Sequence, residues 1–353
     1  MSTMLAGRLH LDTRTFAVEE VPVPVPGPGE VLVEVKAAGV CLSDVHLIDG
    51  SISPFFPAEA VKDAQTVTLG HEVSGVVHSL GPEVKGAWTP GQRVVLQAGQ
   101  ACGECAGCLR RAMCQTPLTR GLDYDGGWAQ YTLAREDTLL PIPDELPFDQ
   151  AAIIPDAVST PYAAIVGTGN VRPAQSVGIW GAGGLGAHGI RLAHLVGAAP
   201  IIAIDPLPSA RERALAFGAD FALDPIAPDF ARAVQEATAG RGIDAAFDFA
   251  GVGAARAQAA SVLAPMGSLV LAGLTPEPLA VEDSLGFCFN MNQVRGHYGS
   301  EPEHVEQLVR LVSTGRINLA SSITAHVPLA EAAEAVARLE KKAGDPIRLV
   351  LTP

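Results

Sequence analysis

Hydrophobic and polar residues follow two different patterns along the chain, and the change between them divides it into regions. Up to about residue 141 the apolar runs are short and alternate with polar residues, which predicts strands at 31–37, 73–77 and 93–96. Turns rich in glycine and proline separate these runs. The first region is therefore predicted to be a mostly β domain, a barrel or a sandwich.

The second region, from about 157 to 296, alternates between buried strands and amphipathic helices. Apolar runs predict strands at 176–180, 200–204, 219–223, 243–248 and 268–273. Between them, apolar positions spaced by three and four residues predict helices from 185 and over 210–218. This order of elements is typical of a parallel sheet covered by helices, so we expect an α/β fold for this region.

The pattern from 297 onward predicts a return to the first region. Helical periodicity is present at 305–313 and 330–339, and 347–351 has the composition of a closing strand. We therefore expect a discontinuous first domain made of residues 1–156 and 297–353, interrupted by a second domain at 157–296.

A glycine-rich turn joins the first strand of the second region to its helix. Gly181, Gly183 and Gly186 have the spacing G-x-G-x-x-G, with Gly184 and Leu185 between them. The first glycine permits a tight turn, the second lets a pyrophosphate approach the backbone, and the third lets helix pack on strand. A turn that only packs is the alternative, but the strand, helix and second strand that surround it favour a dinucleotide site.

Acidic and strand-end residues of the same region complete the expected NAD site. Asp205 ends the second strand nineteen residues after Gly186, where a carboxylate can accept hydrogen bonds from a ribose. Because a dinucleotide lies at the carboxyl ends of parallel strands, further cofactor contacts are expected there; the candidates are Arg211, Ala250, Gly251 and Leu274.

Composition and charge exclude several classes of partner. The chain has 353 residues, of which 48% are hydrophobic and 18% charged, as in ordinary globular enzymes. A net charge of −14 without any cluster of Lys and Arg argues against a nucleic-acid or anionic-membrane partner. The sequence shows neither a signal-like N-terminus nor a run of 18 apolar residues, so we expect a cytoplasmic protein.

Four of the six cysteines form a compact motif. Cys102, Cys105, Cys108 and Cys114 have the spacing C-x2-C-x2-C-x5-C. Four thiolates within thirteen residues suit a closed tetrahedral structural zinc, in a lobe at about 97–116. An iron–sulfur cluster is the alternative, since similar runs bind clusters.

A second group of candidate metal ligands lies in the first region. Cys41, Ser43, Asp44 and His46 fall within six residues, and Gly70-His71-Glu72 follows about thirty positions after the cysteine. A thiolate and an imidazole can bind a metal, but a single cysteine or histidine is more often an ordinary buried residue. Taken alone, the group is only suggestive.

These motifs, in this order, resemble the zinc-dependent medium-chain alcohol dehydrogenases, of the medium-chain dehydrogenase/reductase superfamily, essentially from end to end. The resemblance implies a GroES-like catalytic domain beside a Rossmann domain. It implies that Cys41 and His71 bind a catalytic zinc. It also implies that Ser43 contacts the substrate oxygen and that His46 is the outer member of a proton relay.

The resemblance assigns further residues around that zinc. Glu72 corresponds to a carboxylate beside the metal, able to act as an alternate ligand, and Asp44 to the residue that hydrogen-bonds the imidazole of His71. The third ligand is often a cysteine, which is absent here; alignment of the residues that follow places Asp156 there instead. A carboxylate is an acceptable zinc ligand, although a loop or capping role for Asp156 is the alternative.

Three other features belong to this interpretation of the sequence. Arg348 is implied as a pyrophosphate contact, with a solvated terminal arginine as the alternative. The spacing between Cys108 and Cys114 is shorter than in relatives, so the lobe either folds more tightly or binds metal less well. An insertion from Gly50 to Thr68, which includes Phe55 and Phe56, either shapes the substrate cleft or lies on the surface.

The resemblance implies a reaction, cofactors and partners. An alcohol and an aldehyde or ketone would be interconverted with NAD, and two zinc ions would be bound per chain. The alternatives are a dehydrogenase of a hydroxyacyl thioester or polyol, and a non-catalytic nucleotide-sensing protein. A small-molecule substrate and a homo-oligomer, either dimer or tetramer, are expected.

Overall fold

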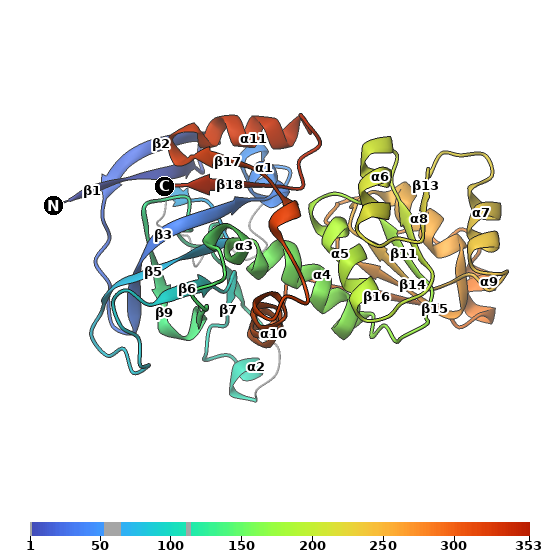
Figure 1. Cartoon of the computed structure of the whole chain (residues 1–353), viewed down its shortest axis with the longest axis horizontal. Helices are drawn as coiled ribbons and strands as arrows, with labels where there is room; N and C mark the ends of the chain where they lie inside the picture. Colours follow the sequence, from blue (N-terminus) through green and yellow to red (C-terminus); the bar gives the residue numbers. More distant parts are fainter. Residues whose placement is uncertain (1, 53–64, 111–113) are drawn as a thin grey trace. The chain divides into compact units, whose positions relative to one another are not determined.

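The computed structural model describes residues 2–52, 65–110 and 114–353, which divide into two compact units (Figure 1). Unit 1 contains Met1–Asp156 and Ser300–Pro353, and unit 2 contains Ala157–Gly299. The chain thus leaves the first unit and later returns to it. The second boundary lies at 300 rather than at the expected 297.

Unit 1 is built on a seven-stranded sheet. Its strands are β3 (Glu30–Val40), β5 (Val73–Leu80), β6 (Arg93–Leu96), β9 (Tyr131–Arg135), β10 (Leu139–Pro141), β17 (Ile323–Pro328) and β18 (Arg348–Thr352). They are arranged in the order β10-β6-β5-β3-β18-β17, with β9 also paired to β3. Strand β18, from the end of the chain, pairs antiparallel with β3, so the returning segment supplies an internal strand.

Two smaller sheets and a set of helices complete unit 1. The small sheets have the orders β2-β1-β4 and β7-β8, with β1 (Thr3–His10), β2 (Thr15–Pro22), β4 (Thr66–Thr68), β7 (Gly99–Gln100) and β8 (Leu118–Thr119). The helices are α1 (Leu42–Asp49), α2 (Ala106–Leu109), α3 (Phe148–Ala152), α10 (Pro302–Ser313) and α11 (Ala332–Glu340). The short helical turns are η1 (Glu136–Thr138), η4 (Ala320–Ser322) and η5 (Leu329–Glu331). In α11 the residues at i, i+3, i+4 and i+7 are buried and join the core of the main sheet.

Unit 2 contains a six-stranded parallel sheet. Its strands are β11 (Val177–Trp180), β12 (Ile201–Ile204), β13 (Phe221–Leu223), β14 (Ile243–Asp248), β15 (Leu263–Leu271) and β16 (Gln293–Gly296). The order β13-β12-β11-β14-β15-β16 is that of a doubly wound dinucleotide-binding sheet, in which the direction of winding reverses between β11 and β14. The expected α/β architecture is therefore present.

Helices precede and connect the strands of unit 2. They are α4 (Ser159–Ala163), α5 (Gly184–Leu195), α6 (Pro208–Ala216), α7 (Phe230–Ala237), α8 (Gly253–Ser261) and α9 (Ser284–Phe289), with π-helical turns η2 (Ile154–Val158) across the boundary and η3 (Ala164–Thr168). Within the described residues, no helix combines the length and apolar character needed to cross a bilayer.

The expected insertion at Gly50–Thr68 is described only at its two ends. Strand β4 at its C-terminal end pairs with β1. Residues 53–64, which include Phe55 and Phe56, lie outside the described residues.

Candidate metal and dinucleotide sites

The start of α1 positions the first candidate metal ligand. Cys41 is the N-cap residue directly after β3, and its backbone N–H donates to Oδ2 of Asp44 at 2.9 Å. This bond satisfies a free N–H at the helix start and fixes the first turn. His71 lies between β4 and β5, and Asp156 lies in the π-helical turn η2, a type of turn that is frequent at functional sites.

The structure brings Cys41, His71 and Asp156 together. Oδ2 of Asp156 lies 3.5 Å from Sγ of Cys41 and 3.3 Å from Nε2 of His71, and the three ligand atoms are all within 4.8 Å of one another. Thiolate, imidazole and carboxylate are the three side-chain ligand types that zinc prefers. The donor set therefore fits a zinc ion held by three protein ligands, with a fourth position left for another group.

The negatively charged side chains around His71 also favour a bound cation. Burial disfavours the charged imidazole, but Asp44 and then Asp156 outweigh it and raise the pKa of His71 well above its usual value. Oδ1 of the fully buried Asp44 lies 3.6 Å from Nδ1 of His71, slightly longer than a hydrogen bond. The same carboxylates that favour a proton on this imidazole would favour a metal ion next to it.

The two remaining candidates near the cysteine lie on α1. Ser43 Oγ is 3.7 Å from Sγ of Cys41. The ring of His46 is 40% exposed, and its Nδ1 lies 2.9 Å from Oγ of Ser51 and 3.8 Å from Asp49. Ser43 is therefore beside the three-ligand group, and His46, one turn further along the helix, reaches solvent.

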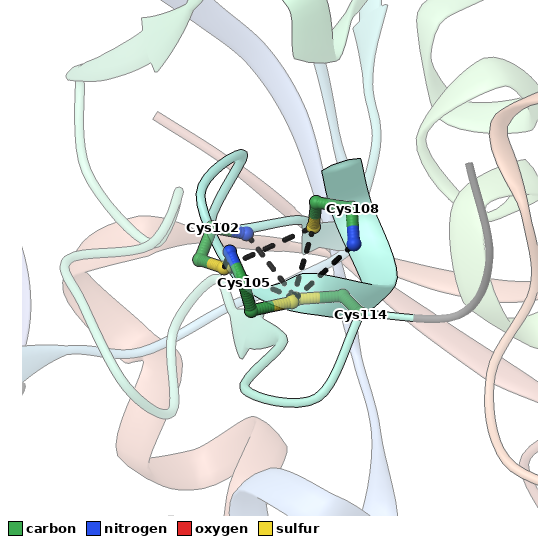
Figure 2. Close-up of side chains that lie close together, drawn as sticks. All are labelled: Cys102, Cys105, Cys108 and Cys114. Atoms are coloured by element: carbon green, nitrogen blue, oxygen red, sulfur yellow. Dashed lines mark hydrogen bonds between the residues drawn. The ribbon is translucent and has the colours of Figure 1, made fainter. Parts of the chain in front are cut away.

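The four cysteines of the second motif converge on one point (Figure 2). Four of the Sγ–Sγ separations between them lie between 3.5 and 4.0 Å. Four sulfurs that surround one zinc at 2.3 Å in tetrahedral geometry lie about 3.8 Å apart. In a [4Fe–4S] cluster each cysteine binds a different iron and the cysteine sulfurs must lie further apart, so this geometry favours a single ion.

Hydrogen bonds in this cysteine lobe favour thiolates. The Thr116 side chain, followed by backbone N–H groups, lowers the pKa of Cys102 to about 6, and N–H groups of Gln115 and Cys108 lower the pKa of Cys105. Desolvation instead raises the pKa of the Cys108 thiol to about 12. The shorter final spacing has not separated the ligands, because the four sulfurs all lie within 4.8 Å of one another.

The glycine turn of unit 2 has the backbone geometry that a dinucleotide needs. Gly181 has φ +87°, and a Cβ at Gly186 would lie 1.7 Å from the carbonyl oxygen of Gly181, so neither position accepts a side chain. Around Gly183, at the start of α5, a Cβ would meet nothing within 4 Å. The residues thus fit a pyrophosphate placed at the helix N-terminus.

Asp205 is closely tied to this turn. Its Oδ2 accepts the N–H of Ala182 at 2.8 Å, its Oδ1 accepts the N–H of Leu207 at 2.9 Å, and the residue is 8% exposed. Each carboxylate oxygen has a second lone pair, so acceptance of a ribose hydroxyl is still possible. Asp205 therefore also fixes the backbone of the glycine turn.

The other expected contacts lie at the carboxyl ends of β14 and β15. The N–H groups of Ala250 and Gly251 donate to Oδ1 of Asp248, at 3.0 and 2.9 Å, and Leu274 is 41% exposed. Arg256 holds the other oxygen of the fully buried Asp248 at 2.7 Å. This ion pair, which sequence reasoning missed, fixes both strand-end loops.

Comparison with known proteins identifies the family of this chain. Residues 27–144 match the family described as alcohol dehydrogenase GroES-like domain, and residues 184–314 the family described as zinc-binding dehydrogenase. The chain is 32% identical to the L-threonine 3-dehydrogenase of Pyrococcus horikoshii over 86% of each protein, and 31% identical to the NAD-dependent alcohol dehydrogenase of Sulfurisphaera tokodaii over 96% of each. The chain belongs to the zinc-dependent medium-chain dehydrogenase family.

Solved structures of this medium-chain dehydrogenase family agree with the fold. A zinc-binding dehydrogenase from Sinorhizobium meliloti, bound to NADP, superposes with a TM-score of 0.90 over the full length of both chains, at 27% identity. As a member of the family the protein is an oxidoreductase of the alcohol dehydrogenase type, with a GroES-like domain and a Rossmann domain.

One arginine of this medium-chain dehydrogenase lies in a buried ion pair that the sequence did not predict. Arg348, expected at a pyrophosphate or in solvent, is only 3% exposed, and its Nη2 pairs with Oε1 of Glu72 at 2.8 Å. Its Nη1 donates to the carbonyl of Val40 at 3.2 Å, and Nη2 is 3.7 Å from Asp156. This burial excludes the solvated alternative, because β18 is internal to its sheet and its first side chain points into the site; the contact of Arg348 with a pyrophosphate stays a prediction.

This ion pair also changes the interpretation of Glu72. Burial raises the pKa of Glu72 to about 7, while Arg348 acts against that rise. The carboxylate is fully buried beside His71 but is not one of the three grouped ligand atoms. A Cβ at Gly39 would lie 1.8 Å from Oε2 of Glu72, so β3 has a glycine where this carboxylate packs.

Proposed function

We propose that this protein interconverts an alcohol with an aldehyde or ketone and transfers a hydride to or from NAD, with one structural and one catalytic zinc ion per chain. The observation that supports it most directly is the grouping of Cys41, His71 and Asp156 within 4.8 Å, in a chain whose family binds zinc. Two relatives are named for alcohol or threonine dehydrogenation, and the substrate of this chain is proposed only as a small alcohol or carbonyl compound.

In this proposal each residue of the site has a defined task. A zinc bound to the three ligands would polarise the substrate oxygen and lower its pKa. Asp44 orients the imidazole of His71, and Arg348 balances the negative charge of Glu72 next to it. The hydroxyl proton would leave through Ser43, which lies beside Cys41, then through the cofactor ribose to the half-exposed His46, which would release it to water.

Preference for NAD over NADP is part of the proposal. NAD would supply the hydride acceptor, and Asp205 would accept hydrogen bonds from its adenosine ribose. A 2′-phosphate would instead meet the negative charge of Asp205, so kcat/KM is expected to favour NAD+ by at least about a hundredfold. Initial rates with a panel of alcohols and both cofactors measure this. Equal efficiency with both would contradict the role of Asp205, and no turnover with any alcohol would favour a non-catalytic protein.

Assembly and location complete the proposal: we infer a cytoplasmic homo-oligomer, either dimer or tetramer. All six cysteines are free, as in reducing compartments. Strand β16 ends the sheet of unit 2, and Leu285, Phe289 and Met291 nearby are 63 to 86% exposed. Sedimentation equilibrium is expected to give at least twice the chain mass; the mass of a single chain would contradict it.

A further inference from the structure

An acidic residue that no motif includes lies beside Asp205. In the parallel pairing of β12 with β13, Ile204 is opposite Leu223, and the N–H of Asp205 donates to the carbonyl of Leu223. Asp224 therefore follows β13 at the sheet edge where Asp205 follows β12. Two carboxylates are thus adjacent at the edge where the adenosine ribose of a dinucleotide is bound.

Between these carboxylates lies Arg211, from α6. Its Nη1 donates to the carbonyls of Asp205 and Pro206, at 2.7 and 2.8 Å, and is 3.4 Å from Oδ2 of Asp224. The two side chains of the ion pair are 21% and 32% exposed, so they are partly shielded from solvent. Nη1 of Arg211 is therefore already engaged by two backbone carbonyls and by the carboxylate of Asp224.

An arginine at this place would ordinarily favour a 2′-phosphate. Guanidinium groups bind phosphate through paired, charge-assisted hydrogen bonds, and an arginine near the ribose accommodates NADP in dinucleotide folds. Within the family both cofactors occur, since one relative is named NAD-dependent and another was solved with NADP. The presence of Arg211 alone thus does not favour NAD.

We propose that Asp224 is a positioning residue for cofactor choice: it holds Arg211 against the backbone after β12 and neutralises its charge, so that Arg211 is not available to pair with a 2′-phosphate. This inference rests on the proposed NAD function and extends it to a residue outside the glycine turn. Asp205 repels the phosphate directly, whereas Asp224 acts through the arginine.

Binding of cofactor fragments tests this without turnover. Isothermal titration of AMP and of adenosine 2′,5′-bisphosphate, which differ only by the 2′-phosphate, gives the ratio of their affinities and isolates the effect of that phosphate. In Asp224→Asn this ratio is expected to shift toward the 2′-phosphate by about tenfold. Asp224→Glu, which keeps the carboxylate, is expected to retain the original ratio.

Two further variants separate the mechanism from a general loss of negative charge. Glu236→Gln removes one charge from an exposed pair with Arg232 in the same unit and is expected to leave the ratio unchanged. In an Arg211→Gln background, Asp224→Asn is expected to have no effect, because the residue acts through the arginine.

The outcomes distinguish this inference from the proposed function. If the unmodified protein binds neither fragment, the nucleotide function fails and this inference with it. If AMP binds but Asp224→Asn leaves the ratio of affinities unchanged, or shifts that ratio equally in the Arg211→Gln background, the role of Asp224 is wrong while the proposed function stands.

Discussion

Asp156→Ala is expected to abolish turnover and to lower the zinc content from two ions per chain to one. The substitution leaves two of the three grouped ligands, Cys41 and His71, which is fewer than catalytic zinc sites use. Activity should fall by more than about a thousandfold. Loss of a residue that only hydrogen-bonds a metal ligand typically costs about 10- to 100-fold, so the two roles can be distinguished. Elemental analysis and initial rates on the same preparation measure both quantities.

A matched substitution controls for damage to this segment. Asp149→Ala removes a carboxylate seven residues earlier, whose partner is the exposed ring of His326, and should leave both zinc ions and activity in place. If Asp156→Ala keeps full activity, the alignment that makes this residue a ligand is wrong. A visible absorption band from the cysteine lobe would instead indicate an iron–sulfur cluster.

Arg348→Met is expected to lower the free energy of unfolding by about 3–5 kcal/mol, because it leaves the fully buried carboxylate of Glu72 without this cation. Chemical denaturation of the metal-loaded protein measures the change. The double substitution Arg348→Met with Glu72→Gln should recover part of the lost free energy of unfolding, since the buried negative charge of Glu72 is then absent.

The surface pair of Arg310 and Glu306 supplies the control. Their side chains are 73% and 66% exposed at a separation of 3.3 Å, so Arg310→Met should change stability by less than about 0.5 kcal/mol. If Arg348→Met is as mild as this control but weakens cofactor binding, the stabilising role of the ion pair is contradicted and the predicted contact of Arg348 with the pyrophosphate is favoured.

Periodicity predicted the elements of this fold well where burial dominates. Strands β6 and β14 lie at the residues expected, 93–96 and 243–248, because short segments in which apolar residues dominate are typical of buried strands. The glycine turn and Asp205 were also recognisable, since their spacing is set by local backbone geometry. The features that could be predicted from the sequence are thus mostly short local motifs.

Long-range contacts were harder to predict. The position of Arg348 depends on the pairing of β18 with β3, which lies about 300 residues earlier in the chain. No local sequence pattern predicts the register of that pairing. The same holds for the pairs of Arg256 with Asp248 and of Arg211 with Asp224. Asp156 was found only through resemblance, because a single aspartate in a π-helical turn has no periodic signal.

The internal position of β18 also bears on how the chain assembles during synthesis. All of unit 2, Ala157–Gly299, leaves the ribosome before residue 348 is made, so it can fold while the main sheet of unit 1 still lacks the strand between β3 and β17. Until Arg348 is synthesised, Glu72 lacks the cation with which it pairs in the folded protein. A nascent chain thus carries a complete dinucleotide fold before its metal site is enclosed.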